Sequence, residues 1–443
     1  MHQFFSGTFF NFEAVRILGT CRYGGCEVAE FLDAIGKVKQ GNAESWNQAW
    51  AEQARLAEEL AVEALSQGQI SAARSAFFRA ANYTRASGYM YHGEAAGQSD
   101  RRTITSLHRA RDLFRKAVNL LEGPVYTLDI PYGKSGVTLP AYLYLPPARC
   151  RLPDGKTPLI VNPVGADSIQ EEIYFMHPAA GPKLGYAVLT FEGPGQGLTL
   201  HEHNIPFRQD WEAVNSLVLD YVLAWISQHA SHDENLGSID ASRIGITGAS
   251  LGGYFALRAA ADSRFAACAA IDPLYDLFDF ATKHVSPAFI KAWEHGWVSD
   301  GMVDALMGLG MAVGFQTRWE IATARRFLGV ATPAQCLKAM RLFTLREDHP
   351  DGQGNGSYLK RVKCPVLVTG AAESLYLDVT DHTAAVFEAL GGEKELWVGT
   401  SPGAGGLQAK MGAIGLANQR VFAFFDRQLG VVRETPGFQS SNN

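Results

Sequence analysis

The stretch from Arg243 to Arg258 constrains the fold more than any other part of the chain. An apolar run, Ile244–Thr247, predicts a buried strand, and Tyr254–Leu257 predicts a helix. Between them lies Gly248-Ala-Ser-Leu-Gly252, in which the small residues let strand and helix approach closely. This strand–turn–helix context predicts a nucleophile elbow, a strained turn that exposes the Ser250 hydroxyl at the edge of a sheet. The alternative is a glycine-rich turn around a buried serine.

Apolar segments of strand length alternate with helical segments over the larger part of the chain. This alternation predicts an α/β fold with a mostly parallel, eight-stranded sheet that is covered on both faces. The first two strands are expected to form a hairpin because glycines lie between them. The predicted strands span residues 125–130, 137–145, 158–162, 186–191, 244–247, 266–271, 365–369 and 395–398, and a helix over 416–429 closes the core.

The pattern also predicts how the chain divides into parts. Residues 1–122 have helical spacing throughout and are interpreted as an N-terminal helical lid, with aromatic residues such as Trp46 and Trp50 in its core. Residues 123–434 form the sheet domain, and residues 274–358 form a helical cap inserted into it. The polar tail, 435–443, is expected to be frayed.

Composition narrows the classes of partner. The chain has 443 residues, 47% hydrophobic residues and a net charge of −6 without long charged runs, which argues against nucleic acid and anionic membranes as partners. The six cysteines are scattered, so neither a disulfide framework nor a metal site is expected, and a reducing, cytoplasmic location fits them. The N-terminus lacks the features of a signal peptide, and no window is apolar enough for a membrane span.

A nucleophilic serine needs an acid, a base and donors for the oxyanion. The acid is expected just after the next-to-last strand, where Glu373 lies; the alternative is a solvated loop carboxylate. The backbone amides of Leu251 and Ala166 are the predicted oxyanion hole. Asp167 and Tyr254 are assigned to substrate binding, and no metal or cofactor is expected.

The expected histidine is missing. It should follow the last strand, in Gly399–Gly406, but no histidine occurs after His382. We name His382, which opens the helix after Glu373, as a tentative substitute, although a capping or surface role is the simpler interpretation. His284, in the predicted cap, is a second outside candidate.

Several motifs together resemble one family, the α/β-hydrolases with an N-terminal helical lid, which includes polyketide-shortening pigment hydrolases and dihydropseudooxynicotine hydrolases. The motifs are Tyr23-Gly-Gly25, Ala80-Ala-Asn-Tyr83, Gly165-Ala-Asp-Ser168, Glu192-Gly-Pro-Gly-Gln-Gly197, Phe207-Arg-Gln-Asp-Trp-Glu212 and Gly248–Gly253. The resemblance implies cleavage of carbon–carbon or ester bonds in ketone-bearing substrates, and a homodimer. It assigns the nucleophile to Ser250 and the acid to Glu373. The sequence departs from the family near Ser401–Gly403, where the histidine would fall, and there it resembles a fungal branch that acts on polyketide–amino-acid intermediates.

Three functions remain in competition. The first is an enzyme of secondary metabolism that cleaves a polyketide or polyketide–amino-acid intermediate through Ser250. The second is a cyclase or condensation enzyme that uses the oxyanion hole without a complete triad, because such a hole stabilises an enolate as well as a tetrahedral adduct. The third is a non-catalytic binding protein on a hydrolase scaffold, which would need neither the elbow nor the acid.

Overall fold

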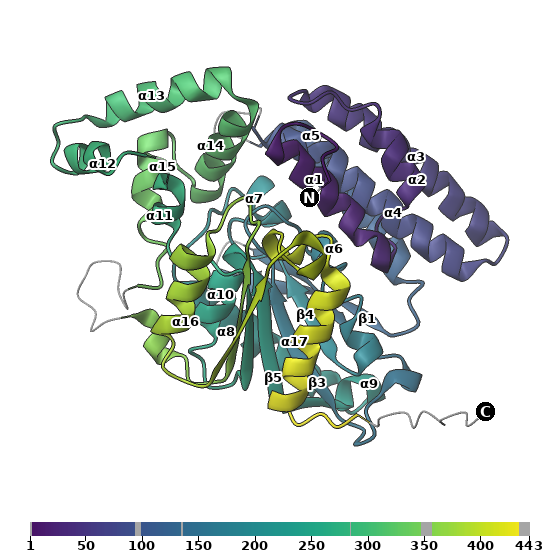
Figure 1. The fold of residues 1–443 in the computed structure, drawn as a ribbon. Coiled ribbons are helices and arrows are strands. Elements are labelled where there is room, and N and C mark those ends of the chain that lie inside the picture. Colours follow the sequence, from purple (N-terminus) through teal and green to yellow (C-terminus); the bar gives the residue numbers. More distant parts are fainter. Residues whose placement is uncertain (1, 94–98, 134–135, 284, 347–356, 434–443) are drawn as a thin grey trace, which may run out of the picture.

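A single eight-stranded sheet organises the molecule (Figure 1). The structure is a computed structural model that describes residues 2–93, 99–133, 136–283, 285–346 and 357–433. The sheet order is β1-β2-β4-β3-β5-β6-β7-β8. The β1–β2 and β2–β4 pairs are antiparallel and the remaining pairs are parallel, as predicted. The strands are β1 (Val125–Tyr132), β2 (Val137–Tyr144), β3 (Thr157–Pro163), β4 (Ala187–Phe191), β5 (Ile239–Ala249), β6 (Ala267–Ile271), β7 (Val366–Ala371) and β8 (Lys394–Gly399).

The central strands are buried on both faces, because alternate side chains enter different cores. Leu159 and Val161 of β3 pack with α8 (Trp211–His229) and α10 (Leu251–Ala259), whereas Ile160 packs toward α17 (Ile414–Gln428). This two-sided burial explains why these strands are continuous apolar runs in the sequence. Shorter helices complete the sheet domain: α6 (Gln170–Ile173), α7 (Gly197–His201), α9 (Glu234–Gly237) and α16 (Ala385–Ala389).

Among the described residues, five α-helices precede the sheet, and they are called the N-terminal lid below. The long pair α3 (Ala43–Ser66) and α4 (Ile70–Tyr89) packs side by side with α1 (Thr8–Leu18), α2 (Val28–Ile35) and α5 (Arg101–Val118). Trp46 and Trp50 are almost fully buried, 5.8 Å apart between ring centroids, and the Trp46 indole N–H donates to the Ala86 carbonyl. The aromatic residues of this region therefore form its core.

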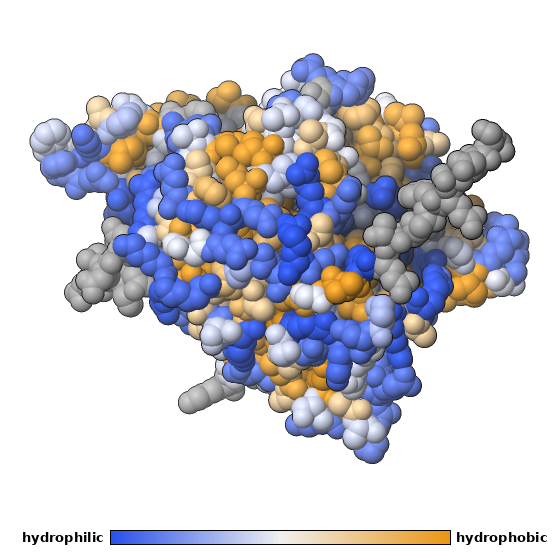
Figure 2. All heavy atoms as spheres, turned by 60° about the horizontal axis from the view of Figure 1, so that its bottom comes forward, coloured by the Kyte–Doolittle hydropathy of each residue, from blue (hydrophilic) through white to orange (hydrophobic). Residues whose placement is uncertain are grey.

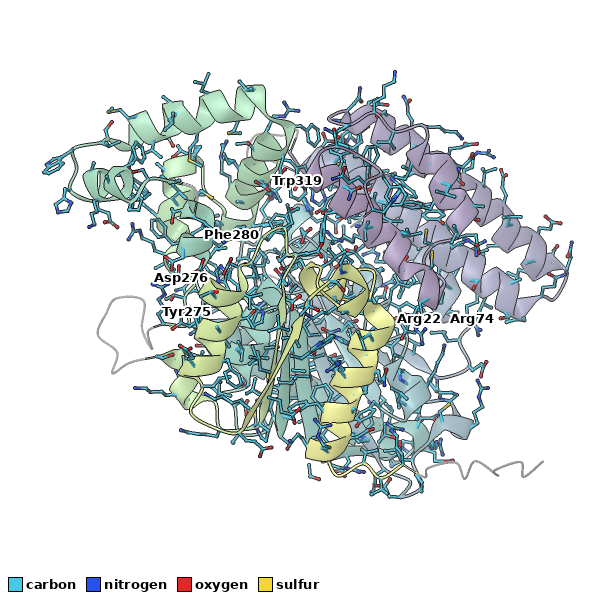
Figure 3. The ribbon with its side chains drawn as sticks, in the orientation of Figure 1. Arg22, Arg74, Tyr275, Asp276, Phe280 and Trp319 are labelled. Carbon is cyan, nitrogen blue, oxygen red and sulfur yellow. The ribbon has the colours of Figure 1, made fainter. Side chains whose placement is uncertain are left out.

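Between β6 and β7 the described part of the chain contains five further α-helices, called the cap below: α11 (Leu277–Thr282), α12 (Pro287–Glu294), α13 (Asp300–Val313), α14 (Phe315–Leu328) and α15 (Pro333–Met340). Cap and lid both lie at the carboxyl end of the parallel strands and meet at Trp319 of α14, which Figure 3 labels. The Trp319 indole N–H donates to the Tyr89 carbonyl at 3.1 Å, and its ring lies 5.1 Å from that of Phe9. The cap is therefore packed directly on the lid.

The underside of the molecule, away from the cap and lid, has a mixed surface. Figure 2 brings the underside of Figure 1 forward and shows mainly hydrophilic residues with separate apolar patches. Among the helices that the structure describes, none has the length and apolar character needed to cross a bilayer.

Candidate active site

Ser250 sits on the turn between β5 and α10 with a backbone that L-residues rarely adopt. Its φ is 57° and its ψ is −120°. The Ser250 amide donates to the Ile271 carbonyl of β6 at 2.9 Å, which holds the turn against the neighbouring strand. A Cβ on Gly248 would come within 2.2 Å of the Gly252 carbonyl, so this turn requires glycine. The strained backbone is the geometry expected of a nucleophile elbow.

The loop after β3 crosses directly over this turn. A Cβ on Gly165 would lie 3.3 Å from the Ala249 carbonyl, and one on Gly252 would lie 3.3 Å from the Pro163 carbonyl. The two backbones can approach this closely because both contact residues are glycines. The predicted second oxyanion donor, Ala166, therefore follows a residue that contacts the elbow.

Gln196 fixes the orientation of that loop. Its side-chain amide donates to the carbonyls of Val164 at 2.6 Å and Gly165 at 3.0 Å. In a trans peptide the next N–H points opposite to the carbonyl, so the Ala166 amide points away from Gln196. Among the described residues, neither the Ala166 amide nor the Leu251 amide has a hydrogen-bond acceptor. Two amides without acceptors thus lie on adjoining segments beside Ser250.

The predicted acid, Glu373, follows β7 and is exposed. Its backbone amide donates to the Gly406 carbonyl at 2.8 Å, so the loop after β7 is joined to the loop after β8. Glu373 therefore lies on the segment that follows β7, and its role as the acid stays a prediction.

His382 is placed in a different environment. It is 2% exposed, in the π-helical turn Val379–Ala384, and its Nδ1 accepts the backbone amide of Tyr275 at 3.2 Å. Burial lowers the pKa of His382 to about 4, so the ring is neutral near pH 7 and carries its proton on Nε2. Within the described part of the chain, no hydrogen bond joins it to Ser250. The contact instead holds the base of the cap, where Figure 3 labels Tyr275. The other candidate, His284, lies outside the described residues.

A buried ion pair between Lys410 and Asp272 fixes the loop after β8, the loop in which the histidine was expected. Lys410 is fully buried, and its Nζ lies 2.7 Å from Asp272 Oδ1 and 2.6 Å from the Gly370 carbonyl oxygen. Asp272 directly follows β6, and Thr369 donates to the same Oδ1 at 2.8 Å. Ala409 and Lys410 both have positive φ, of 55° and 59°. The loop after β8 therefore contributes a buried ammonium group at Lys410, beyond the Gly399–Gly406 stretch in which a histidine was expected and is missing.

Asp167 connects the site to the lid. Arg16 of α1 donates to Asp167 Oδ2 at 2.6 Å and makes a two-point contact with Glu172, at 2.6 Å to each oxygen. The Tyr89 hydroxyl of α4 donates to the same Asp167 oxygen. Arg16 lowers the pKa of Asp167 against the effect of burial, which keeps this carboxyl ionised. The Asp167 side chain is 30% exposed, whereas that of Arg16 is 5% exposed.

Tyr254, the other residue assigned to substrate binding, lies apart from these groups. It is fully buried with the Phe255 and Phe343 side chains, and its hydroxyl donates to the Gln209 carbonyl at 3.1 Å. The structure therefore places its ring in the core behind α10.

Sequence reasoning missed Arg16, Tyr89, Gln196 and the Asp272–Lys410 pair. One signal was available: Glu13 and Arg16 are charged residues in a mainly apolar helix, Thr8–Leu18. Charged residues in such a helix are buried only when they are paired. Within the described ranges, no group of three or more His, Cys, Asp or Glu side chains is placed to hold a metal ion.

Comparison with known proteins agrees with the fold. The model of the prolyl oligopeptidase family matches residues 185–302, which include Ser250. The chain is 50% identical to hydrolase ORFZ of Pyricularia oryzae, over 98% of this chain and 99% of that protein. It is 48% identical to hydrolyase ccsE of Aspergillus clavatus, over 98% and 100%. The solved 2,6-dihydroxy-pseudo-oxynicotine hydrolase shares the fold, with a TM-score of 0.65 at 20% identity over 94% of this chain and 95% of that one. The chain therefore belongs to the α/β-hydrolase family, among fungal hydrolases that match it along almost their entire length.

Proposed function

We propose that this protein is an enzyme that binds a carbonyl group of a small polyketide or polyketide–amino-acid substrate beside Ser250. The amides of Leu251 and Ala166 would hold the carbonyl oxygen as it becomes an oxyanion. The single observation that carries this proposal is the pair of amides without acceptors next to the strained serine. Donors that are already oriented stabilise developing charge without reorganisation. The motifs shared with lidded hydrolases support the substrate class.

Cleavage of an ester or carbon–carbon bond through Ser250 is the first form of this function. It is favoured by the elbow itself, because a non-glycine residue in such a backbone conformation costs about 1–3 kcal/mol. A buried, inert serine would not need that conformation. In this form Ser250 attacks the carbonyl carbon, Leu251 and Ala166 hold the oxyanion, and Glu373 is the proposed acid, with a base still required.

Ring closure or condensation without serine attack is the second form. It is favoured by the loop after β8, which contains no histidine and instead contributes Lys410 to a buried ion pair with Asp272. The same two amides would hold an enolate oxygen while its carbon forms a new bond. Here Ser250 would serve as a hydrogen-bonding hydroxyl.

A fluorophosphonate and p-nitrophenyl butyrate would separate the two forms. For cleavage, mass spectrometry would find the fluorophosphonate on Ser250, and Ser250→Ala would lower ester hydrolysis by at least ~10³-fold. Ser242→Ala is the matched control, because Ser242 lies on the same strand and its hydroxyl donates to Asp240 at 2.6 Å. For ring closure, Ser250 stays unlabelled while the enzyme accelerates α-proton exchange of N-hexanoylaminoacetone in D2O. Absence of both activities would contradict the proposed function.

A further inference from the structure

Three side chains in contact, those of Glu13, Tyr89 and Asp167, connect the lid helix α1 to the site. Tyr89 of α4 stands between two carboxyl groups: its hydroxyl oxygen contacts Asp167 Oδ2 and lies 3.3 Å from Glu13 Oε1. A phenol has one proton to donate, so it cannot donate to both carboxylates at once. Because the contact to Asp167 is the shorter one, the contact to Glu13 is a hydrogen bond only if Glu13 carries the proton and donates to the phenolic oxygen.

The charges of the surrounding side chains also require a proton on one carboxyl group. Two buried guanidinium groups, of Arg16 and Arg85, face three carboxyl groups, of Glu13, Asp167 and Glu172. The cluster is neutral only when one carboxyl is protonated, and an excess buried charge is costly. Glu13 is the most enclosed of the three, with a side chain that is 3% exposed. Burial raises the pKa of Glu13 to about 7, above that of an ordinary glutamate.

The two carboxylate oxygens of Asp167 differ in their hydrogen bonds. Arg16 and Tyr89 both bind Oδ2, and among the described residues nothing donates to Oδ1. Asp167 also follows Ala166, whose amide is a proposed oxyanion donor. Since consecutive Cα atoms lie about 3.8 Å apart, one small functional group can contact both residues.

We propose that Asp167 Oδ1 is the proton acceptor of this site, in place of the missing imidazole, and that Glu13 and Tyr89 hold Asp167 ionised from within the lid. This assignment rests on the proposed function. In the step, a C–H bond next to the substrate carbonyl breaks and an O–H bond forms at Asp167 Oδ1. The electron pair left behind moves to the carbonyl oxygen, which the Leu251 and Ala166 amides hold. Asp167 is the catalytic residue, while Glu13 and Tyr89 act through it as positioning residues.

Infrared spectroscopy tests the proton on Glu13 without any substrate. The wild-type spectrum should contain a protonated carboxyl band that disappears as the pH passes about 7 and that Glu13→Gln lacks, whereas a separate band from buried Glu192, whose pKa burial raises to about 8, should remain in both proteins. Glu30→Gln is the matched control, because Glu30 is also a lid carboxyl that accepts a tyrosine hydroxyl, that of Tyr83 at 2.7 Å. Persistence of the first band in Glu13→Gln would overturn the assignment.

Exchange of the α-protons of N-hexanoylaminoacetone in D2O, followed by NMR, tests Asp167. We expect the wild type to accelerate exchange and Asp167→Asn to lose at least ~10²-fold of it. The wild-type exchange rate should show an inflection near pH 7, because ionised Glu13 then competes for the Tyr89 proton. The exchange rate of Glu13→Gln should show no such inflection. Charged and titratable groups that face Glu13 are Arg16, Arg85, Tyr89, Asp167, Glu172 and Tyr376.

Two controls keep the outcomes distinct. Tyr89→Phe, which preserves both carboxyl groups, should remove the inflection, whereas Tyr83→Phe on the same helix should leave it. Unchanged exchange in a folded Asp167→Asn protein, or no exchange by the wild type, would overturn the role of Asp167. If the fluorophosphonate labels Ser250 in a wild type without exchange, the proposed function survives and this inference fails.

Discussion

Two aspartates at the same edge of the sheet, Asp167 and Asp272, have opposite surroundings. Each follows a strand, and each pairs with a cation that comes from a distant part of the chain. Asp272 and Lys410 are 2% and 0% exposed, whereas the Asp167 side chain is 30% exposed. Asp272 is closed off by a structural ion pair, while Asp167 keeps an accessible oxygen. The two pairs thus differ in whether a carboxylate remains accessible, which is the property that the proposed role of Asp167 requires.

The largest effect should come from breaking the closed pair. Lys410→Met leaves Asp272 buried without its cation, which should lower the free energy of unfolding by about 3–5 kcal/mol. Urea denaturation measures this change. Lys338→Met removes an exposed pair with Asp300 and should cost less than about 1 kcal/mol. Equal losses in the two variants would show that burial does not distinguish Lys410.

Glu13→Gln should change how stability depends on pH. The pKa of Glu13 is raised in the folded state, so its protonated form stabilises the fold below the unfolded value of 4.5. That stabilisation, about 3 kcal/mol for a shift of this size, is lost as the pH rises toward 7. The difference between wild type and Glu13→Gln in urea denaturation should therefore follow this pH window. A constant difference between about pH 4 and pH 8 would contradict the protonated state.

Replacing each aspartate by asparagine compares the two directly. Asp272→Asn should cost about 2–3 kcal/mol, because Lys410 loses its only buried counter-charge among the described residues. Asp167→Asn should cost only about 1 kcal/mol, since Arg16 keeps its two-point contact with Glu172. Thermal or urea unfolding of both variants measures the contrast. The reverse order would show that Asp167 is the structural member.

The smallest effect is expected at His382. His382→Asn can still offer an acceptor to the Tyr275 amide, so the loss of stability should be about 1 kcal/mol or less. Fluorophosphonate labelling of Ser250 should be unchanged. Loss of labelling in a folded His382→Asn protein would restore His382 as the base.

The fold could be predicted because its signals are local. The apolar run of β5 and the glycines beside Ser250 determine the strand, the turn and the start of α10 from adjacent residues. Leu251 and Ala166 were predicted as oxyanion donors from equally local information, their places in a strand–loop pattern, and this assignment stays a proposal. The aromatic spacing of α3 likewise predicted a core that includes Trp46 and Trp50.

Arg16 and Lys410 could not be predicted, because their places depend on contacts between segments that are distant in the sequence. Arg16 lies 151 residues from Asp167 in the sequence, and no periodicity indicates that these two segments meet. Lys410 is similar, because its role depends on a loop that folds back to the end of β6. Tyr254 shows the opposite problem: it is close to Ser250 in sequence, but α10 turns its ring into the core. Sequence proximity to a nucleophile therefore does not assign a side chain to its pocket.

The contact between Trp319 and Tyr89 joins the cap to the lid at a residue that also contacts the site. The cap reaches the lid through an indole that donates to the Tyr89 carbonyl and lies 5.0 Å from the Tyr89 ring. Tyr89 is also the residue that joins Glu13 to Asp167. Any movement that separates the cap from the lid removes a support from this tyrosine. If Asp167 acts as proposed, a movement of the cap relative to the lid would also change the environment of the Glu13–Tyr89–Asp167 contacts, through this one aromatic pair.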